Sequence, residues 1–190
     1  MLTNAYIDGT NLYYGALRGT PHKWLDLRRM LELVFPNDEI RAIHYFTSVV
    51  RSVPTDPSAP SRQQAYIRAL RTVPGLTVHL GVIRGRGSPR EKMTDVALAT
   101  RLIADASQRR FEQAIVVSND ADFVPAILSA KNEFEAVVAV LNPVLRGRTQ
   151  SDLESAATYV RRLRRRHVAA SQLPSLLHDA MGAIAKPADW

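Results

Sequence analysis

The chain has 190 residues, a mass of 21.1 kDa and a formal net charge of +7, from 25 Lys and Arg against 18 Asp and Glu. At roughly 100–200 residues per domain, this length predicts one domain with at most an appendage. Hydrophobic residues make up 46% of the chain, which excludes a disordered polypeptide. No apolar run approaches the roughly 18 residues that a membrane-spanning helix needs, so we expect no membrane partner.

The chain contains no cysteine, which excludes disulfide frameworks, thiolate zinc sites, iron–sulfur clusters and cysteine nucleophiles. Residues 1–4 lead directly into an apolar segment without a basic stretch, so no secretory signal is predicted. A cytoplasmic location fits both features and is the expected one.

The positive charge is unevenly distributed. Residues 1–145 hold 17 Lys or Arg and 14 Asp or Glu, whereas residues 146–190 hold 8 and 4. This excess favours a polyanionic partner, with ordinary solubility as the alternative.

Short apolar runs alternate with helical patterns along the chain. The predicted elements are, in chain order, a strand over 5–7, a helix over 25–35, a strand over 42–46, a helix over 61–72, a strand over 77–83, a helix over 93–110, a strand over 114–117, a helix over 123–132 and a strand over 136–141. The strands are mostly continuous apolar runs, which is typical of parallel strands buried on both faces. The alternation predicts an α/β fold with a central, mostly parallel sheet flanked by helices.

Two loops and a C-terminal segment complete this organisation. Residues 52–61 contain three prolines, and residues 84–90 form a strongly basic loop. The pattern after Pro143 is helical, passes through an arginine-rich run and ends in an amphipathic stretch over 173–185. We therefore expect an α/β domain over 1–145 and a basic helical extension over 146–190. This extension could pack on the domain, form a homodimer contact or bind nucleic acid.

Two predicted strands end in acidic turns. Residues 5–7 lead into Asp8, and residues 114–117 lead into a turn that contains Asp120 and Asp122. Ligands of open α/β sheets bind at the carboxyl ends of the strands, so equivalent acidic turns on two central strands favour a shared site. The structural alternative is that each acid caps the following helix.

A third acid, Asp95, falls on the helix face that also carries Leu98, Ala99 and Leu102. Burial of a lone carboxylate is costly, so this position favours a site shared with Asp8 and Asp120. The alternative is a hydrated acid in the first turn, where the helix dipole stabilises it.

Converging carboxylates would need a cation. Two of them about 4 Å apart repel by about 4 kcal/mol at an effective dielectric near 20. The chain has no Cys, and His22, His44 and His79 lack metal-ligand spacing, so the ligands would be oxygens. Oxygen ligands favour Mg²⁺ or Mn²⁺ over zinc, and such an ion suits phosphate-ester hydrolysis.

Three sequence blocks resemble the signature blocks of the NYN domain, a family of PIN-like nucleases that includes LabA-type bacterial proteins. The blocks are residues 7–12 (IDGTNL), 91–99 (EKMTDVALA) and 117–125 (VSNDADFVP), in the family's order, and the resemblance covers roughly residues 3–142. It implies a PIN-like three-layer fold and metal-dependent cleavage of RNA.

The resemblance also implies site residues. The family's acidic positions correspond to Asp8, Asp95, Asp120 and Asp122, of which the first three are expected to hold Mg²⁺ or Mn²⁺. The expected supporting residues are Asn11, Ser118 and Asn119. The chain departs from the family pattern at Arg101, where many relatives carry Asp, at Asn119, which replaces a common Gly, and at Thr158, which falls near a frequent Asp. The change at Arg101 leaves the core acids intact but could weaken a second metal.

Cations beside these acids would be needed to bind RNA. Lys92, in the second block, and Arg84, Arg86 and Arg90 in the adjacent loop are the expected phosphate contacts, with a solvated loop as the alternative. Tyr13, Tyr14 and Trp24 could stack on a splayed base, with core packing as the alternative.

These features together predict a metal-dependent ribonuclease that acts on single-stranded or structured RNA. Two alternatives remain open at this point. One is a non-catalytic RNA-binding or regulatory module, and the other is a phosphatase that acts on small phosphate esters.

Overall fold

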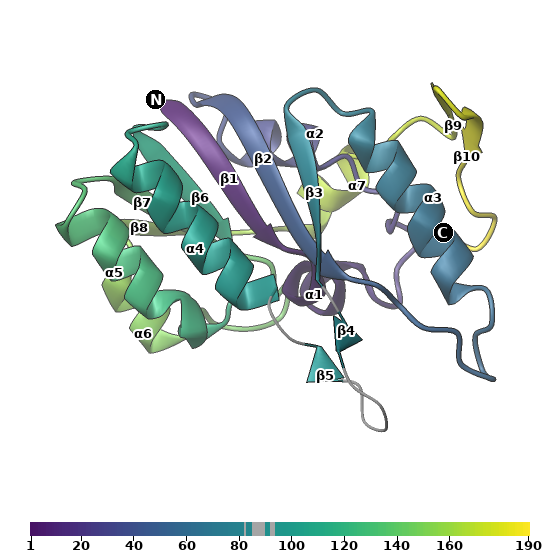
Figure 1. The fold of residues 1–190 in the computed structure, drawn as a ribbon, viewed down its shortest axis with the longest axis horizontal. Coiled ribbons are helices and arrows are strands. Elements are labelled where there is room, and N and C mark those ends of the chain that lie inside the picture. Colours follow the sequence, from purple (N-terminus) through teal and green to yellow (C-terminus); the bar gives the residue numbers. More distant parts are fainter. Residues whose placement is uncertain (82, 85–89, 92–93) are drawn as a thin grey trace.

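The computed structural model of the chain describes residues 1–81, 83–84, 90–91 and 94–190, with the backbone alone for 83–84 and 90–91. Its centre is a six-stranded sheet in the order β3-β2-β1-β6-β7-β8, in which every neighbouring pair is parallel (Figure 1). The strands are β1 (Leu2–Asp8), β2 (Glu39–Ser48), β3 (Leu76–Gly81), β6 (Gln113–Val117), β7 (Val137–Asn142) and β8 (Tyr159–Arg162). The predicted α/β fold with a parallel sheet is confirmed.

Helices cover both faces of this sheet (Figure 1). Leu98 of α4 (Thr94–Ser107), Ile127 of α5 (Val124–Asn132) and Leu153 of α6 (Ser151–Ala156) pack with Tyr6 of β1 in one buried cluster. On the opposite face, Met30 of α2 (Leu27–Val34), Leu70 of α3 (Ala59–Arg71) and Val168 of α7 (Arg165–Ala170) pack with Ile7. Adjacent residues of β1 thus point to opposite faces, which produces a three-layer arrangement.

Shorter elements connect these layers. After β1 the chain forms α1 (Gly9–Leu12) and a wider π-helical turn, η1 (Tyr13–Leu17); after β6 it forms a 3-10 turn, η2 (Ala121–Phe123). Two small antiparallel pairs lie outside the main sheet: β4 (Ile83–Arg84) with β5 (Arg90–Glu91), and β9 (Leu176–Asp179) with β10 (Gly182–Ala185).

The order of the strands reverses at β1. The chain builds β2 and β3 on one side of β1 and then returns to build β6, β7 and β8 on the other. Ile7 of β1 pairs with Val117 of β6, so both strands end at the same edge of the sheet. Ligands of such sheets bind at this reversal, beyond the carboxyl ends of the strands.

The helical character expected for residues 146–190 is wrong in two places. Tyr159–Arg162 form β8, which pairs with β7, because Tyr159 packs toward one face of the sheet and Val160 toward the other. The stretch 173–185 contains the β9–β10 hairpin. Arg68 of α3 binds this hairpin through two hydrogen bonds to Asp179, at 2.9 and 2.6 Å. Within the part of the chain that the structure describes, no helix is long and apolar enough to cross a membrane.

Candidate active site

Asp8 lies where β1 passes into α1, and two donors hold its carboxylate. Oδ1 accepts a hydrogen bond from the backbone N–H of Asn11 at 2.9 Å, and Oδ2 accepts one from the Ser118 hydroxyl at 3.1 Å. Only 8% of the residue is exposed. The next position must be glycine, since a Cβ on Gly9 would lie 2.6 Å from the ring of Tyr45. This close approach allows the acid to sit directly at the strand end.

Asp120 lies in the equivalent turn after β6, and hydrogen bonds connect the two turns. Its N–H donates to Ser118 Oγ at 3.2 Å, and the N–H of Asn119 donates to Asn11 Oδ1 at 3.0 Å. Asp120 also caps η2 by accepting from the N–H of Asp122 at 3.0 Å. Capping and exposure to the site are therefore compatible for both Asp8 and Asp120.

Asp8, Asp95 and Asp120 line one cavity of about 460 Å³ at this edge of the sheet. Asp95 is an exposed residue in the first turn of α4, whereas Leu98 and Leu102 of the same helix are buried. The expected convergence of the three acids thus has a structural basis, with Asp95 at the wet rim. Asn11 lines the same cavity, and Ser118 and Asn119 support it through the bonds described above.

Burial raises the pKa of Asp8 to about 6, and the nearby charges of Asp95 and Asp120 contribute to this rise. The hydrogen bonds from Asn11 and Ser118 act in the opposite direction but do not outweigh burial. A buried carboxylate beside two others is poorly stabilised on its own. A cation in the cavity would relieve this cost.

The donor chemistry of the cavity fits a hard divalent cation, because the charged groups among the described residues that line it are all carboxylates. No three acid or His side chains among the described residues already stand together as a metal-binding group. Mg²⁺ commonly keeps several waters and is held by only one or two carboxylates, so a preassembled cage is not required. Asp8, Asp95 and Asp120 are the residues that would hold such an ion.

Other predicted residues lie elsewhere. Asp122 is exposed on η2 and is not among the residues that line the cavity. Lys92 and Arg86 fall outside the described residues. The backbones of Arg84 and Arg90 pair between β4 and β5, while their side chains are not described. The proposed phosphate contacts of this loop stay predictions.

The three aromatic residues considered for base stacking differ in how far they are exposed. Tyr14 is 63% exposed and lines the cavity, so it is available to stack on a base. Tyr13 packs partly against the core, with its ring against that of Tyr14. The stacking role considered for Trp24 is wrong, because its ring is fully buried and its indole N–H donates to the carbonyl of Pro174 at 2.8 Å.

Sequence reasoning missed Thr10, Gly15, Thr94 and Val144, which also line the cavity. Thr10 and Thr94 lie within or beside the acidic motifs, so their position in the sequence could have identified them. Gly15 and Val144 meet through tertiary packing: a Cβ on Gly15 would lie 3.1 Å from the carbonyl oxygen of Pro143. No local pattern marks that contact.

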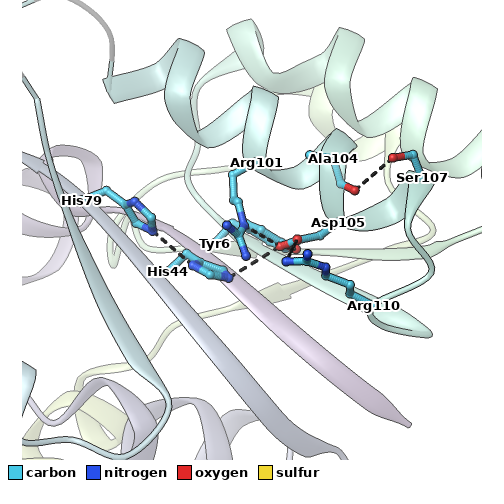
Figure 2. A network of polar contacts seen from close by, with 8 residues as sticks. All are labelled: Tyr6, His44, His79, Arg101, Ala104, Asp105, Ser107 and Arg110. Atoms are coloured by element: carbon cyan, nitrogen blue, oxygen red, sulfur yellow. Dashed lines mark hydrogen bonds and ion pairs between the residues drawn. The ribbon is translucent and has the colours of Figure 1, made fainter.

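Arg101 belongs to a separate buried network (Figure 2). Its Nε donates to Asp105 at 2.8 Å, and Asp105 also accepts from the Tyr6 hydroxyl at 2.9 Å and from Arg110 at 3.2 Å. His44 Nε2 lies 3.6 Å from the same carboxylate. The network holds α4, which carries Asp95, against β1, which carries Asp8.

Thr158, another residue that departs from the family pattern, lies at the opposite end of the sheet from the acids. Its hydroxyl accepts from the N–H of Val138 at the start of β7, at 3.1 Å. Neither Thr158 nor Arg101 is among the residues that line the acidic cavity.

Residues 3–164 match the NYN domain, so the chain belongs to the NYN domain family. This membership suggests a nuclease-type hydrolase that depends on a divalent metal and acts on RNA.

One relative and one solved structure extend the comparison. The chain is 31% identical over an aligned length of 237 residues to the 6-hydroxy-3-succinoylpyridine 3-monooxygenase HspA of Pseudomonas putida, covering 99% of this chain and 75% of that protein. It also resembles the crystal structure of a protein of unknown function from Vibrio parahaemolyticus. There the TM-score is 0.62 and the identity 22%, over 85% of this chain and 91% of the other. The second likeness supports the fold alone.

Proposed function

We propose that this protein is a ribonuclease that hydrolyses phosphodiester bonds with Mg²⁺ or Mn²⁺. The observation that carries the proposal is the meeting of Asp8, Asp95 and Asp120, from three separate segments, in one cavity at the strand reversal of an NYN fold. A bound ion would neutralise charge on the phosphate and make an attacking water more acidic.

The protein's own residues would position that ion and the RNA. Ser118 and the N–H of Asn11 fix the orientation of the Asp8 carboxylate, and Asn119 links the two acidic turns. Tyr14 offers its exposed ring to a base beside the cavity. Lys92, Arg84, Arg86 and Arg90 are proposed phosphate contacts. Asp122 is a proposed supporting acid that would orient the water.

The direct test is incubation of end-labelled single-stranded RNA with the protein, with Mg²⁺, Mn²⁺ or EDTA. Asp8→Asn and Asp120→Asn should abolish cleavage, while Glu154→Gln, which removes an exposed acid on α6, should leave it intact. Retained cleavage in either Asp variant would refute the site.

Other outcomes select the alternatives. RNA binding without new ends would identify a non-catalytic RNA-binding or regulatory module. Hydrolysis of small phosphate esters without RNA cleavage would identify a phosphatase.

A second candidate function, oxygenation of a substituted pyridine, follows from the name of the Pseudomonas putida relative. The observation that favours it is 31% identity across nearly the whole chain. The test is oxygen consumption and product formation from 6-hydroxy-3-succinoylpyridine in the presence of an added two-electron reductant. Turnover that survives Asp120→Asn would assign that activity to a different site from the acidic cavity.

A further inference from the structure

A second cavity, of about 390 Å³, lies beside the acidic one and carries the opposite charge. Arg165 and Arg166 of α7 line it together with His22 and Thr20, which follow η1. Ala16 and Leu145 also contribute to its lining.

Two segments of the chain lie between the two cavities and contribute residues to both. Tyr14, Gly15 and Val144 line the acidic cavity, and the next residues along the chain, Ala16 and Leu145, line the basic one. The N–H of Leu145 donates to the carbonyl of Gly15 at 3.3 Å, which holds the two segments together. Neighbouring residues of the same two segments therefore line both cavities.

The arginines of the basic cavity are available to a ligand. Arg165 and Arg166 are exposed, and neither forms an ion pair with an acid in the described part of the chain. Partial burial and the charges of Arg166 and Arg164 lower the pKa of His167, as expected where positive charge is concentrated. Arginine side chains bind phosphate oxygens through paired, charge-assisted hydrogen bonds.

The walls of the cavity are held by contacts between distant segments. Asp26 N–H donates to the carbonyl of Ser171 at 2.8 Å, and Gln172 donates to the carbonyls of His22 at 3.3 Å and Val168 at 2.9 Å. These bonds fix α7 against the turn that follows η1. The arginines therefore project from a positioned wall.

We propose that the basic cavity binds a backbone phosphate of the RNA strand whose scissile bond lies at the acidic cavity. The intervening nucleotide would stack on Tyr14, whose ring Arg18 also covers at 5.3 Å. Because the assignment rests on the proposed function, its test must separate binding from cleavage.

The test measures binding of a labelled single-stranded RNA by fluorescence anisotropy in EDTA, where metal-dependent cleavage is absent. The test variant is Arg165→Gln/Arg166→Gln. The matched control is Arg41→Gln/Arg71→Gln, which removes two exposed arginines at the opposite edge of the sheet, from the start of β2 and the end of α3. Both variants lose the same charge, so a general electrostatic effect changes them equally.

The test variant should bind about tenfold more weakly than the control. Its salt dependence, plotted as log K against log salt concentration, should become shallower by about 0.7 for each lost phosphate contact. Equal losses in both variants, or no loss in either, would overturn the proposal. Thermal unfolding at the wild-type temperature would confirm that each variant is folded.

Two further arms identify the ligand and the activity. Displacement of the RNA by AMP as effectively as by unlabelled RNA would indicate a site for small phosphates and overturn the RNA path. Cleavage assays with Mn²⁺ on the same proteins test the proposed function separately. Selective loss of binding in the test variant, without cleavage by any of the proteins, would support the basic cavity and refute the nuclease. Cleavage without a selective loss of binding would support the nuclease and overturn the assignment of the basic cavity.

Discussion

The substitution Asp8→Asn should stabilise the metal-free protein, although it removes a proposed metal ligand. Burial, together with the charges of Asp95 and Asp120, raises the pKa of Asp8 to about 6. An Asn side chain keeps the shape of the neutral acid. Its oxygen can accept from the N–H of Asn11, and its amide can donate to the hydroxyl of Ser118.

The size of the effect follows from the pKa difference. The folded-state pKa of about 6 lies above the ordinary value of 3.8, so the folded protein holds this proton more tightly than the unfolded chain. The resulting stability is fully present below pH 3.8 and is lost as the pH rises through 6, by about 3 kcal/mol. Asn does not ionise. The variant should therefore gain up to about 3 kcal/mol over wild type above pH 7 and little near pH 4.

Thermal unfolding in EDTA across this pH range measures the difference. For a chain of this size, about 3 kcal/mol corresponds to roughly 6–12 °C in Tm. The control Glu154→Gln should stay within about 0.5 kcal/mol of wild type. Saturating Mn²⁺ should raise the Tm of wild type, because the ion binds the folded state, and should leave that of Asp8→Asn nearly unchanged.

Two results would refute this reasoning. One is an Asp8→Asn variant that is no more stable than wild type at neutral pH in EDTA. The other is an equal gain in Tm from Mn²⁺ in both proteins, which would place the ion away from Asp8.

Three further predictions concern packing and the buried network. Gly9→Ala should destabilise the fold by about 1–3 kcal/mol in urea unfolding, because the new Cβ would contact the Tyr45 ring at 2.6 Å; wild-type stability would contradict this close packing. Burial, then the charge of Arg101, lowers the pKa of His44 to about 4. The stability that neutral His44 contributes is complete above pH 6.5 and should thus fall by about 3 kcal/mol as the pH drops through 4. His44→Gln should reduce this loss of stability in acid, and an unchanged loss would count against the assignment. Arg101→Asp should cost about 3 kcal/mol or more, measured by the same unfolding, because it leaves buried Asp105 with one cation fewer and a like charge one turn away; a loss below 1 kcal/mol would show that Arg110 suffices.

The sequence predicted the sheet and the acidic turns well because both depend on local patterns. Parallel strands buried on two faces appear as continuous apolar runs, and their carboxyl ends meet at one edge whatever the loops do. Asp8 and Asp120 could therefore be placed together from the positions at which two runs end. The position of Asp95 was harder to predict, because its face of α4 is buried at Leu98 but exposed to solvent one turn earlier, at Asp95 itself.

The C-terminal strand could not be predicted by the same reasoning. β8 has four residues, of which only Tyr159 and Val160 are apolar, and arginines follow directly. Over so short a stretch, a helical and an extended pattern are indistinguishable, and pairing with β7 decides between them. The contact of Gly15 with Pro143 likewise joins residues far apart in the chain, so it has no local signal.

Arg101 shows why a departure from a family pattern needs its structural partner before it is interpreted. Taken alone, an arginine in place of an acid suggests a weakened metal site. In the fold, Arg101 points to Asp105, a carboxylate that is 1% exposed and that would be unstable without cations. The arginine thus neutralises an acid that the same helix supplies four residues later. The change at this position therefore acts on how α4, which also carries Asp95, is held against the sheet.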